Sequence, residues 1–447
     1  MTTRYDMNQP IRIGLCGFGV VGQGVWKHLH ARRRELDQRL GASMQIVRIA
    51  VRNPKKDRGI PLPEEMVTRD PMSIATDPEI PIVCELMGGT GIAREITEAA
   101  LRAGKIVVTA NKALLSEHGP QVFRAAREGG GHILFEASVG GGIPIIKALR
   151  EGLVANRFRL IYGILNGTCN YILTRMEREG LAYSEVLADA KRLGYAEAEE
   201  SLDVDGWDTA HKASILAFLA HGTWVRLEDM MVDGIRRITP ADFAFARSFK
   251  MSIKLLAVIT RNFETADLSI SVRPTLVPER LVMSSVNEVY NGICVAGDVV
   301  GTTLYIGRGA GQDATASAVI GDLADAAMVL MGGKSSLLPD EAPSLLDGRE
   351  APLTITPAAH LWGRYYLRLT VKDAPGVLAQ VAASMAAHEV SIGSVLQKES
   401  GVPDCAALIL TTHRTNEEAI GRTIADLGRM PVVMEDPVLL RIADFED

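Results

Sequence analysis

The chain has 447 residues, of which 47% are hydrophobic and 23% are charged, and its formal net charge is −6. This length and balance indicate a globular protein of about three domains, each able to bury a core. The absence of an overall basic charge argues against nucleic acid as a partner. No apolar leader and no apolar run of roughly 18 residues is found, so a membrane partner is not expected. Five scattered cysteines without metal-ligand spacing suit a reducing compartment, and we predict a cytoplasmic location.

Strands and helices alternate in the first third of the chain. Apolar runs predict strands at 11–16, 45–51, 80–87, 105–110 and 132–139. Helical patterns lie between the later strands, at 92–104 and 120–130, and each ends in glycine. This alternation predicts an α/β fold with a doubly wound parallel sheet of the Rossmann type. We assign it to residues 1–142, with residues 305–331 returning to it.

A glycine-rich turn, "GFGVVG", follows the first predicted strand and opens a helix that continues to about Leu40. Gly17 permits a tight turn, Gly19 lets the backbone approach a pyrophosphate, and Gly22 lets the helix pack on the strand. The helix N-terminus offers unpaired N–H groups to phosphates. The alternative is a glycine turn without a ligand. The predicted cofactor-binding residues here are Gly17, Phe18, Gly19, Val20, Val21 and Gly22.

The end of the second predicted strand indicates which dinucleotide binds. NAD-binding domains usually carry an acidic residue there for the ribose hydroxyl. This chain has "AVRNPKK" instead, with Arg52 in a position to contact a 2′-phosphate. We therefore predict NADP(H) as the preferred cofactor, with NAD(H) as the second choice; the alternative for Arg52 is a solvated basic turn.

The alternation of strands and helices ends at about residue 143. A strand at 159–165, helices at 166–180 and 183–194, and strands at 267–274 and within 288–309 predict an α+β domain over 143–304, with Ser184 capping the second helix. Residues 332–362 are rich in Pro, Gly and charge and are predicted to form a linker. The tail, 363–447, shows a βαββαβ order, which is typical of a ferredoxin-like module. Its predicted strands are 365–371, 390–398, 405–413 and 431–442, and its predicted helices are 377–389 and 416–428.

Three groups of polar residues stand at the predicted edges of these elements. "LDVDGWDTAHK" (202–212) can be explained locally, with Asp205 capping an apolar helix and Asp208 pairing with Lys212 one turn later. Lys112 follows a strand of the parallel sheet, at the edge where ligands bind. Glu136 precedes a glycine-rich turn, and a carboxylate with backbone carbonyls suits a hard cation.

These motifs resemble those of the homoserine dehydrogenase family, in its bacterial form with a C-terminal ACT domain. The resemblance rests on "GFGVVG", "TANKALLS", "FEASVGGGIPII", "GILNGTCNYILTRM", "LGYAEAEESLDVDGWDTAHK" and "GRGAGQDATASAV". The tail "YYLRLTVKDAPGVLAQVAASMAAHEVSIGSVLQ" resembles ACT domains, which bind small amino acids. The chain departs from the family pattern at Glu199, Glu200 and Ser201, where "EADP" is frequent.

The resemblance implies NAD(P)-dependent interconversion of L-aspartate 4-semialdehyde and L-homoserine in the pathway to threonine and methionine. It implies that Lys212 donates the proton to the aldehyde oxygen and that Lys112 lies by substrate and nicotinamide, although the two lysines could exchange roles. Further implied roles are substrate binding by Glu197 and Asp208, with Asp203 beside them, and cofactor contact by Gly194 and Gly311. Na⁺ or K⁺ would be held by Glu136 and the carbonyls of Val139, Gly141 and Ile143.

Several alternatives remain at this stage. The chain could be a different NADP-dependent oxidoreductase acting on another amino-acid aldehyde, or a non-enzymatic sensor. Cys169 is expected to be structural, because hydride transfer to an aldehyde needs no covalent step. The turn from Asp373 to Gly376 is expected to bind an effector, threonine by resemblance; the alternative is a plain turn in a dimerisation module. The resemblance also implies a homodimer or homotetramer.

Overall fold

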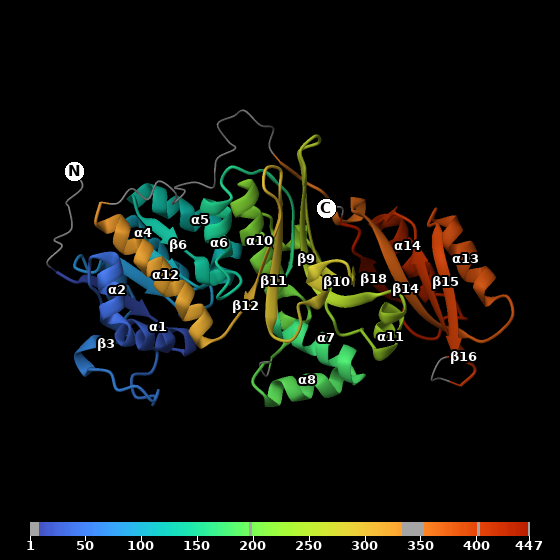
Figure 1. Ribbon diagram of the computed structural model, residues 1–447, viewed down its shortest axis with the longest axis horizontal. Coiled ribbons are helices and arrows are strands. Elements are labelled where there is room, and N and C mark those ends of the chain that lie inside the picture. The colour runs from blue at the N-terminus through green and yellow to red at the C-terminus, as the bar shows by residue number, and fades with distance from the viewer. Residues whose placement is uncertain (1–8, 196–198, 333–352, 400–402, 446–447) are drawn as a thin grey trace.

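The computed structural model describes residues 9–195, 199–332, 353–399 and 403–445. Figure 1 shows three units in a row, with the N-terminal unit in blue, a central sheet in green and yellow, and the C-terminal unit in red. In the described part of the chain, no helix is both long and apolar enough to cross a membrane.

The N-terminal unit is a six-stranded parallel sheet in the order β3-β2-β1-β4-β5-β6. The central strands are apolar and buried on both faces because helices cover both sides of the sheet. The strands are β1 (Ile11–Cys16), β2 (Met44–Ala50), β3 (Val67–Thr68), β4 (Ile82–Glu85), β5 (Ile106–Thr109) and β6 (His132–Leu134). The helices are α1 (Val20–Ala31), α2 (Arg33–Leu40), α3 (Met72–Thr76), α4 (Ile92–Arg102), α5 (Lys112–Gly129) and, from far along the chain, α12 (Gln312–Leu330).

The return of α12 to this unit is visible in Figure 1, where the orange helix lies among the blue ones. Gly24 makes the close packing possible, because a Cβ there would lie 2.8 Å from the side chain of Gln312. The preceding strand β12 (Gly301–Arg308) belongs to the central sheet, so the return begins at about residue 309 rather than at 305.

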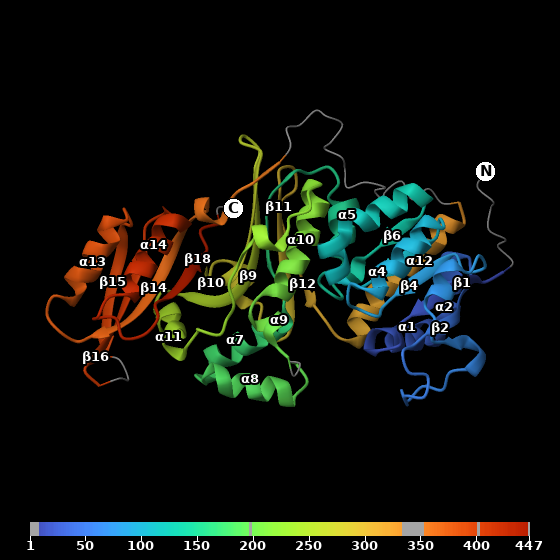
Figure 2. The same cartoon turned by 180° about the vertical axis from the view of Figure 1, so that it is seen from behind.

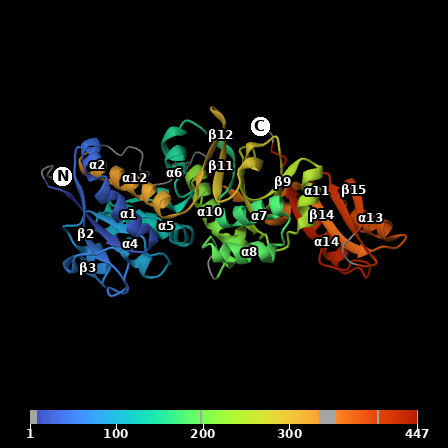
Figure 3. The same cartoon turned by 60° about the horizontal axis from the view of Figure 1, so that its bottom comes forward.

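The central unit is built on long antiparallel strands that helices cover. α10 lies between this sheet and α5, as Figure 2 shows from behind, and Figure 3 shows α7 and α8 side by side. Its strands are β7 (Phe158–Ile164), β8 (Met231–Val232), β9 (Met251–Asn262), β10 (Asp267–Pro278), β11 (Tyr290–Gly297) and β12. Its helices are α6 (Ile145–Lys147), α7 (Gly167–Glu179), α8 (Tyr183–Arg192), α9 (Ser201–Val204), α10 (Trp207–His221) and α11 (Pro240–Ser248).

The C-terminal unit has the predicted βαββαβ order. Its strands are β14 (Trp362–Lys372), β15 (Ile392–Glu399), β16 (Cys405–Thr412) and β18 (Val438–Ile442), with the short β13 (Thr354–Ile355) and β17 (Thr415–Asn416) at its margins. Its helices are α13 (Val377–Ala387) and α14 (Glu417–Gly428).

The central and C-terminal units share one sheet, which the sequence did not predict. β18 pairs with β14 on one side and, in parallel, with β10 on the other, giving the order β12-β11-β7-β9-β10-β18-β14-β16-β15. Buried polar contacts reinforce the junction: Asp242 accepts from Tyr366 Oη and Arg368 Nε, both at 2.7 Å, and Arg273 pairs with Glu417. The C-terminal unit is therefore fixed to the unit that carries α10.

Several element boundaries differ from those expected. The last strand covers 438–442 rather than 431–442, and the sixth strand stops at Leu134 because residues 136–138 form a 3₁₀ turn. α5 begins at Lys112, capped by Asn111, and runs through Pro120 instead of starting there. Part of the predicted linker pairs with β10 as β13. The prediction for Ser184 was wrong, since α8 begins at Tyr183 and Glu185 accepts the N–H of Ala182 at 3.0 Å.

Candidate active site

The glycine turn has the shape that a dinucleotide needs. Gly17 has φ 105°, and a Cβ there would lie 2.5 Å from the Leu86 carbonyl oxygen. A Cβ at Gly22 would lie 2.3 Å from the carbonyl oxygen of Gly17, so the helix and strand ends pack through these two residues. Gly19 has no neighbour within 4 Å of a Cβ position, which leaves the start of α1 open to a pyrophosphate. The residues present therefore fit the predicted cofactor.

Two of the other predicted cofactor residues flank this turn. Arg52 is exposed and stands two residues after Ala50, whose carbonyl accepts the N–H of Gly17 at 3.0 Å. Gly311 caps α12 with φ 115°, and the next residue, Gln312, donates to the carbonyl of Val20 at 3.1 Å. The fold thus brings Gln312, and with it the neighbouring Gly311, to the start of α1 from 292 positions further along the chain.

The two predicted lysines meet at one buried carboxylate. Asp208 is 5% exposed, and its Oδ1 lies 2.7 Å from Lys112 Nζ while its Oδ2 lies 2.7 Å from Lys212 Nζ. Lys212 also donates to the Leu165 carbonyl at 2.7 Å. Lys212 lies one turn after Asp208 on α10, whereas Lys112 arrives from the first turn of α5. Because β5 is two strands from β1 in the sheet, the cluster stands roughly 10 Å along the edge from the glycine turn.

Asn166 belongs to the same cluster, and the sequence reasoning did not single it out. Its Nδ2 donates to Asp208 Oδ2 at 2.9 Å and to Asp203 Oδ1 at 2.7 Å, while its Oδ1 caps α7 by accepting the N–H of Cys169. A polar residue before a helix start is a common cap, so the motif "NGTCNYI" alone gave no sign of this second role. Asp203 is thereby joined to Asp208 through a shared amide.

Burial and neighbouring charges set the protonation of the cluster. Burial alone would raise the pKa of Asp208, but the ammonium groups of Lys212 and Lys112 outweigh it and hold that pKa well below its usual range. Burial lowers the pKa of Lys212 in spite of the adjacent carboxylate. Burial, together with the charge of Asp208, raises the pKa of Asp203. The cluster therefore holds a firmly ionised acceptor beside a lysine that gives up its proton more readily than usual.

Two residues near the cluster, Cys169 and Asp205, have structural roles rather than chemical ones. Cys169 is fully buried, its Sγ contacts the Asp203 carbonyl at 3.2 Å, and burial raises the pKa of its thiol well above the ordinary value, which leaves little thiolate for attack. The expectation that Asp205 caps α10 was wrong. Gly206 is the cap, with φ 92°, because the Asp205 carboxylate is drawn to Arg236 at 2.6 Å.

The remaining predicted residues are placed as follows. Gly194 is exposed, with φ 77°, just after α8, and Glu197 lies outside the described residues.

Both oxygens of Glu136 accept backbone N–H groups, of Ile146 at 2.9 Å and Lys147 at 2.8 Å, and burial raises the pKa of Glu136 to about 6. Val139, Gly141 and Ile143 follow Glu136 closely in the sequence, and all three are buried. A carboxylate oxygen has two lone pairs and can accept from an N–H group and bind a cation at once. A monovalent cation at this turn stays a prediction.

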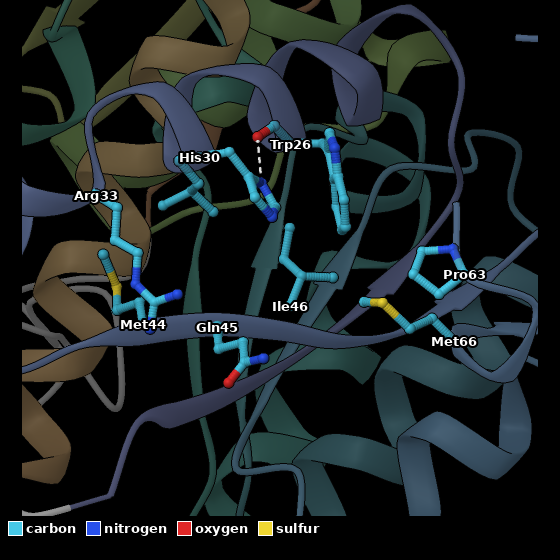
Figure 4. A pocket seen from close by; sticks show the side chains of 9 residues that line it. Trp26, His30, Arg33, Met44, Gln45, Ile46, Pro63 and Met66 are labelled. Carbon is cyan, nitrogen blue, oxygen red and sulfur yellow. Dashed lines mark hydrogen bonds between the residues drawn. The ribbon is translucent and has the colours of Figure 1, made fainter. Parts of the chain in front are cut away.

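Two hollows lie away from the cluster. One, shown in Figure 4, is lined by Trp26, His30, Met44, Ile46 and Met66 among others. It adjoins the start of β2, whereas the glycine turn adjoins the strand ends, so it is separate from the cofactor turn. The other lies in the C-terminal unit at the predicted effector turn and is lined by residues of 371–378 with Gln397 and Leu408.

Comparison with known protein families accounts for most of the chain. The sequence model of the homoserine dehydrogenase NAD-binding domain matches residues 17–136, that of homoserine dehydrogenase matches 144–324, and that of the ACT domain matches 365–431. The first two matches cover the glycine turn, Lys112 and the Asp208 helix.

Individual relatives match over nearly the full length. The chain is 41% identical to the homoserine dehydrogenase of Pseudomonas aeruginosa, over 97% of this chain and 99% of that one. It is 39% identical to that of Neisseria gonorrhoeae, over 98% and 100%. The crystal structure of a homoserine dehydrogenase from Thiobacillus denitrificans superposes with a TM-score of 0.89 at 40% identity, over 98% and 99%. A hyperthermophilic archaeal homoserine dehydrogenase in complex with NADPH gives 0.62 at 25% identity, over 72% and 98%.

Proposed function

Because the chain belongs to the homoserine dehydrogenase family, we propose that the cluster of Asp208, Lys112 and Lys212 is the reaction centre of its NAD(P)-dependent activity. The family, the three-part fold and the oxidoreductase activity between L-homoserine and L-aspartate 4-semialdehyde are confirmed predictions, and they place the enzyme in amino-acid biosynthesis. The full-length matches set aside the alternatives of a different aldehyde oxidoreductase and of a sensor.

One observation carries the proposal: a buried carboxylate lies 2.7 Å from each of two lysines at the edge of the dinucleotide sheet. Asp208 accepts hydrogen bonds from ammonium groups in this structure, and it would accept the α-ammonium of the substrate in the same way. Glu197, which is outside the described residues, would be a second acceptor. The bound cofactor supplies or removes the hydride at the carbon that bears the oxygen.

Lys212 then serves as the proton donor to the aldehyde oxygen. Its pKa is lowered by burial, so it is a stronger acid than a solvated lysine, and Asp208 and the Leu165 carbonyl hold its ammonium in place. Lys112 has a side chain that is 40% exposed, which suits a group that moves towards substrate or nicotinamide when they bind. Its positive charge would stabilise the developing alkoxide.

Lysine variants test these roles. In Lys212→Met, kcat for semialdehyde reduction should fall by at least about a hundredfold, the scale of one general-acid step, with the KM for NADPH unchanged. In Lys112→Met, kcat/KM should fall but a proton donor remains. The reverse pattern would exchange the two roles, and normal turnover in both variants would overturn the proposed centre.

We propose NADP(H) as the preferred cofactor. The support is the exposed Arg52 beside the glycine turn, with no acidic residue from Val51 to Lys56, and a relative described in complex with NADPH. NAD(H) is the alternative, and the ratio of kcat/KM for the two cofactors decides between them.

We also propose that Glu136 and the carbonyls of Val139, Gly141 and Ile143 hold Na⁺ or K⁺ in a structural role. The turn combines a buried carboxylate with two successive glycines at positive φ, Gly140 and Gly141, which turn the backbone sharply. Dialysis into a choline buffer should lower the melting temperature, and added Na⁺ or K⁺ should restore it. An unchanged melting temperature would contradict this site.

For the ACT domain we propose that threonine binds in the hollow at Asp373–Gly376 and inhibits. The hollow and the opening of α13 at Gly376 support an amino-acid ligand there. If threonine neither inhibits nor raises the melting temperature, this proposal fails.

A homodimer or homotetramer is also proposed. β12 and β15 end the order of the long sheet in the described residues, and Val299 and Val300 are exposed by 72% and 50% next to β12. Light scattering of the purified enzyme tests the assembly. A cytoplasmic location is proposed because none of the five cysteines, all of which lie in the described part of the chain, forms a disulfide.

A further inference from the structure

Arg236 connects the two ends of the short helix α9. It makes a bidentate pair with Asp205 at the C-terminal end, with Nε to Oδ1 at 2.6 Å and Nη2 to Oδ2 at 3.1 Å. At the N-terminal end it reaches Glu200 Oε1 at 3.2 Å and Ser201 Oγ at 3.2 Å. One planar guanidinium thus fixes both ends of a helix of four residues, which is too short to be stable by itself.

The segment that carries Arg236 is itself firmly held. Ile235 is fully buried and donates its N–H to the Val204 carbonyl at 2.9 Å, and Asp233 donates to the Val272 carbonyl of β10 at 2.8 Å. Gly234 allows this approach, since a Cβ there would lie 2.4 Å from the Val204 oxygen. Arg236 therefore stands on a rigid support and holds α9 against it.

Glu200 extends the contact to a third charged residue. Lys191 Nζ lies 2.6 Å from its Oε2, and Lys191 with Arg236 lowers the pKa of Glu200 to about 2. Glu200 and Ser201 are two of the positions at which this chain departs from the family pattern. One end of the contact to Arg236 is thus made by residues at which this chain departs from that pattern, and the other end by Asp205.

Between the two fixed ends, α9 presents Asp203 to the reaction centre. Asp203 Oδ1 accepts from Asn166 Nδ2, and the same nitrogen donates to Asp208 Oδ2. A shift of α9 would withdraw Asp203 from Asn166 Nδ2, so that this nitrogen would lose one of its two carboxylate acceptors. Asn166 would then be held less firmly in the orientation in which it donates to Asp208.

We propose that Arg236 is a positioning residue for the amino-acid substrate: by holding both ends of α9 it keeps Asp203 and Asn166 in register with Asp208. The proposal rests on the proposed reaction centre, and it concerns substrate binding more than the proton transfer, since Arg236 touches neither lysine. The cofactor turn lies on another unit and is not affected.

The test compares Arg236→Met with Arg226→Met in the full-length enzyme. Arg226 makes a similar bidentate pair with Asp229, at 2.8 and 3.0 Å, and has no contact with α9, so it is a matched control. Loss of a multiply bonded but 40% exposed guanidinium should raise the KM for L-homoserine by about five- to tenfold. The KM for NADP⁺ should stay within about twofold and kcat should fall less than the KM rises, with Arg236→Lys intermediate.

A KM for L-homoserine within twofold of wild type would overturn the proposal. Equal changes in both KM values with a large drop in melting temperature would also overturn it, because they would indicate a general structural role. If Arg236→Met does not fold, Glu200→Gln and Asp205→Asn each remove one end of the contact, and an unchanged KM in both contradicts the idea. Loss of turnover in Lys212→Met is independent of these results and tests the reaction centre separately.

Discussion

Replacing Asp208 by asparagine removes the carboxylate that lies 2.7 Å from both lysines of the reaction centre. The variant keeps the size of the side chain but takes away its charge, and it places an amide beside Lys112 and Lys212, which both lie 2.7 Å from the native oxygens. The two ammonium groups then lose the negative charge that Asp208 places between them.

The expected loss follows from the burial of these groups. Removing one partner of a buried ion pair costs about 3–5 kcal/mol of folding stability, and a similar amount of binding free energy when the pair forms with a ligand. The lower end applies, because Lys112 is 40% exposed and gains water, and because Lys212, whose pKa is already lowered, can give up its proton. About 3 kcal/mol of lost transition-state stabilisation corresponds to a decrease of roughly 150-fold in kcat/KM for the amino-acid substrate.

The pH dependence of semialdehyde reduction gives a second measure of the effect of Asp208→Asn. The carboxylate of Asp208 partly offsets the effect of burial on Lys212, so its removal should lower the pKa of Lys212 further. Reduction of the semialdehyde needs protonated Lys212, and the alkaline limb of the profile should therefore move to lower pH in the variant.

The assay follows NADPH consumption with L-aspartate 4-semialdehyde over a range of pH. Asp229→Asn is the control, because this carboxylate pairs with Arg226 on a turn that does not contact the centre. If Asp208→Asn retains kcat/KM within threefold of wild type with an unmoved alkaline limb, the reasoning is refuted.

Four further changes have defined outcomes. Arg52→Ala should lower the preference for NADPH over NADH by about tenfold, the value of one charge-assisted phosphate contact, and an unchanged ratio of kcat/KM would contradict that role. Cys169→Ala should keep turnover within about twofold while lowering stability by about 1 kcal/mol, whereas loss of turnover at full stability would indicate a chemical role. Asp242→Asn should cost about 3 kcal/mol in thermal unfolding, because it leaves the 11%-exposed Arg368 without its carboxylate; an unchanged melting temperature argues against the junction as described. Lys254 is buried with its pKa lowered from 10.5 to about 8, so between these values the unfolded chain binds more protons and stability rises with pH; that rise should be absent in Lys254→Met when urea unfolding is measured at each pH.

Local features of the sequence were sufficient to predict most of the helices and strands and part of the proposed reaction centre. Alternating apolar runs predicted the parallel sheet, because buried strands and the helices between them leave patterns within a few residues. The glycines of the cofactor turn could be predicted for the same reason. Each is required by the backbone conformation or by a close backbone contact at its own position. The pairing of Asp208 with Lys212 was also local, as residues one helical turn apart share a face.

Contacts between distant segments could only come from the tertiary structure. Asp205 and Ser184 were predicted to be helix caps, yet the Asp205 carboxylate pairs with Arg236, and at the start of α8 it is Glu185 that accepts the N–H of Ala182. Lys112 reaches Asp208 from 96 positions away, Asn166 joins Asp203 to Asp208, and β18 pairs with β10 across more than 160 positions. A sequence indicates which local backbone conformation and hydrogen bonds a segment favours. Which partner a charged side chain or an edge strand finds depends on competition among all the groups that folding brings together, and that competition was decided only in the complete fold.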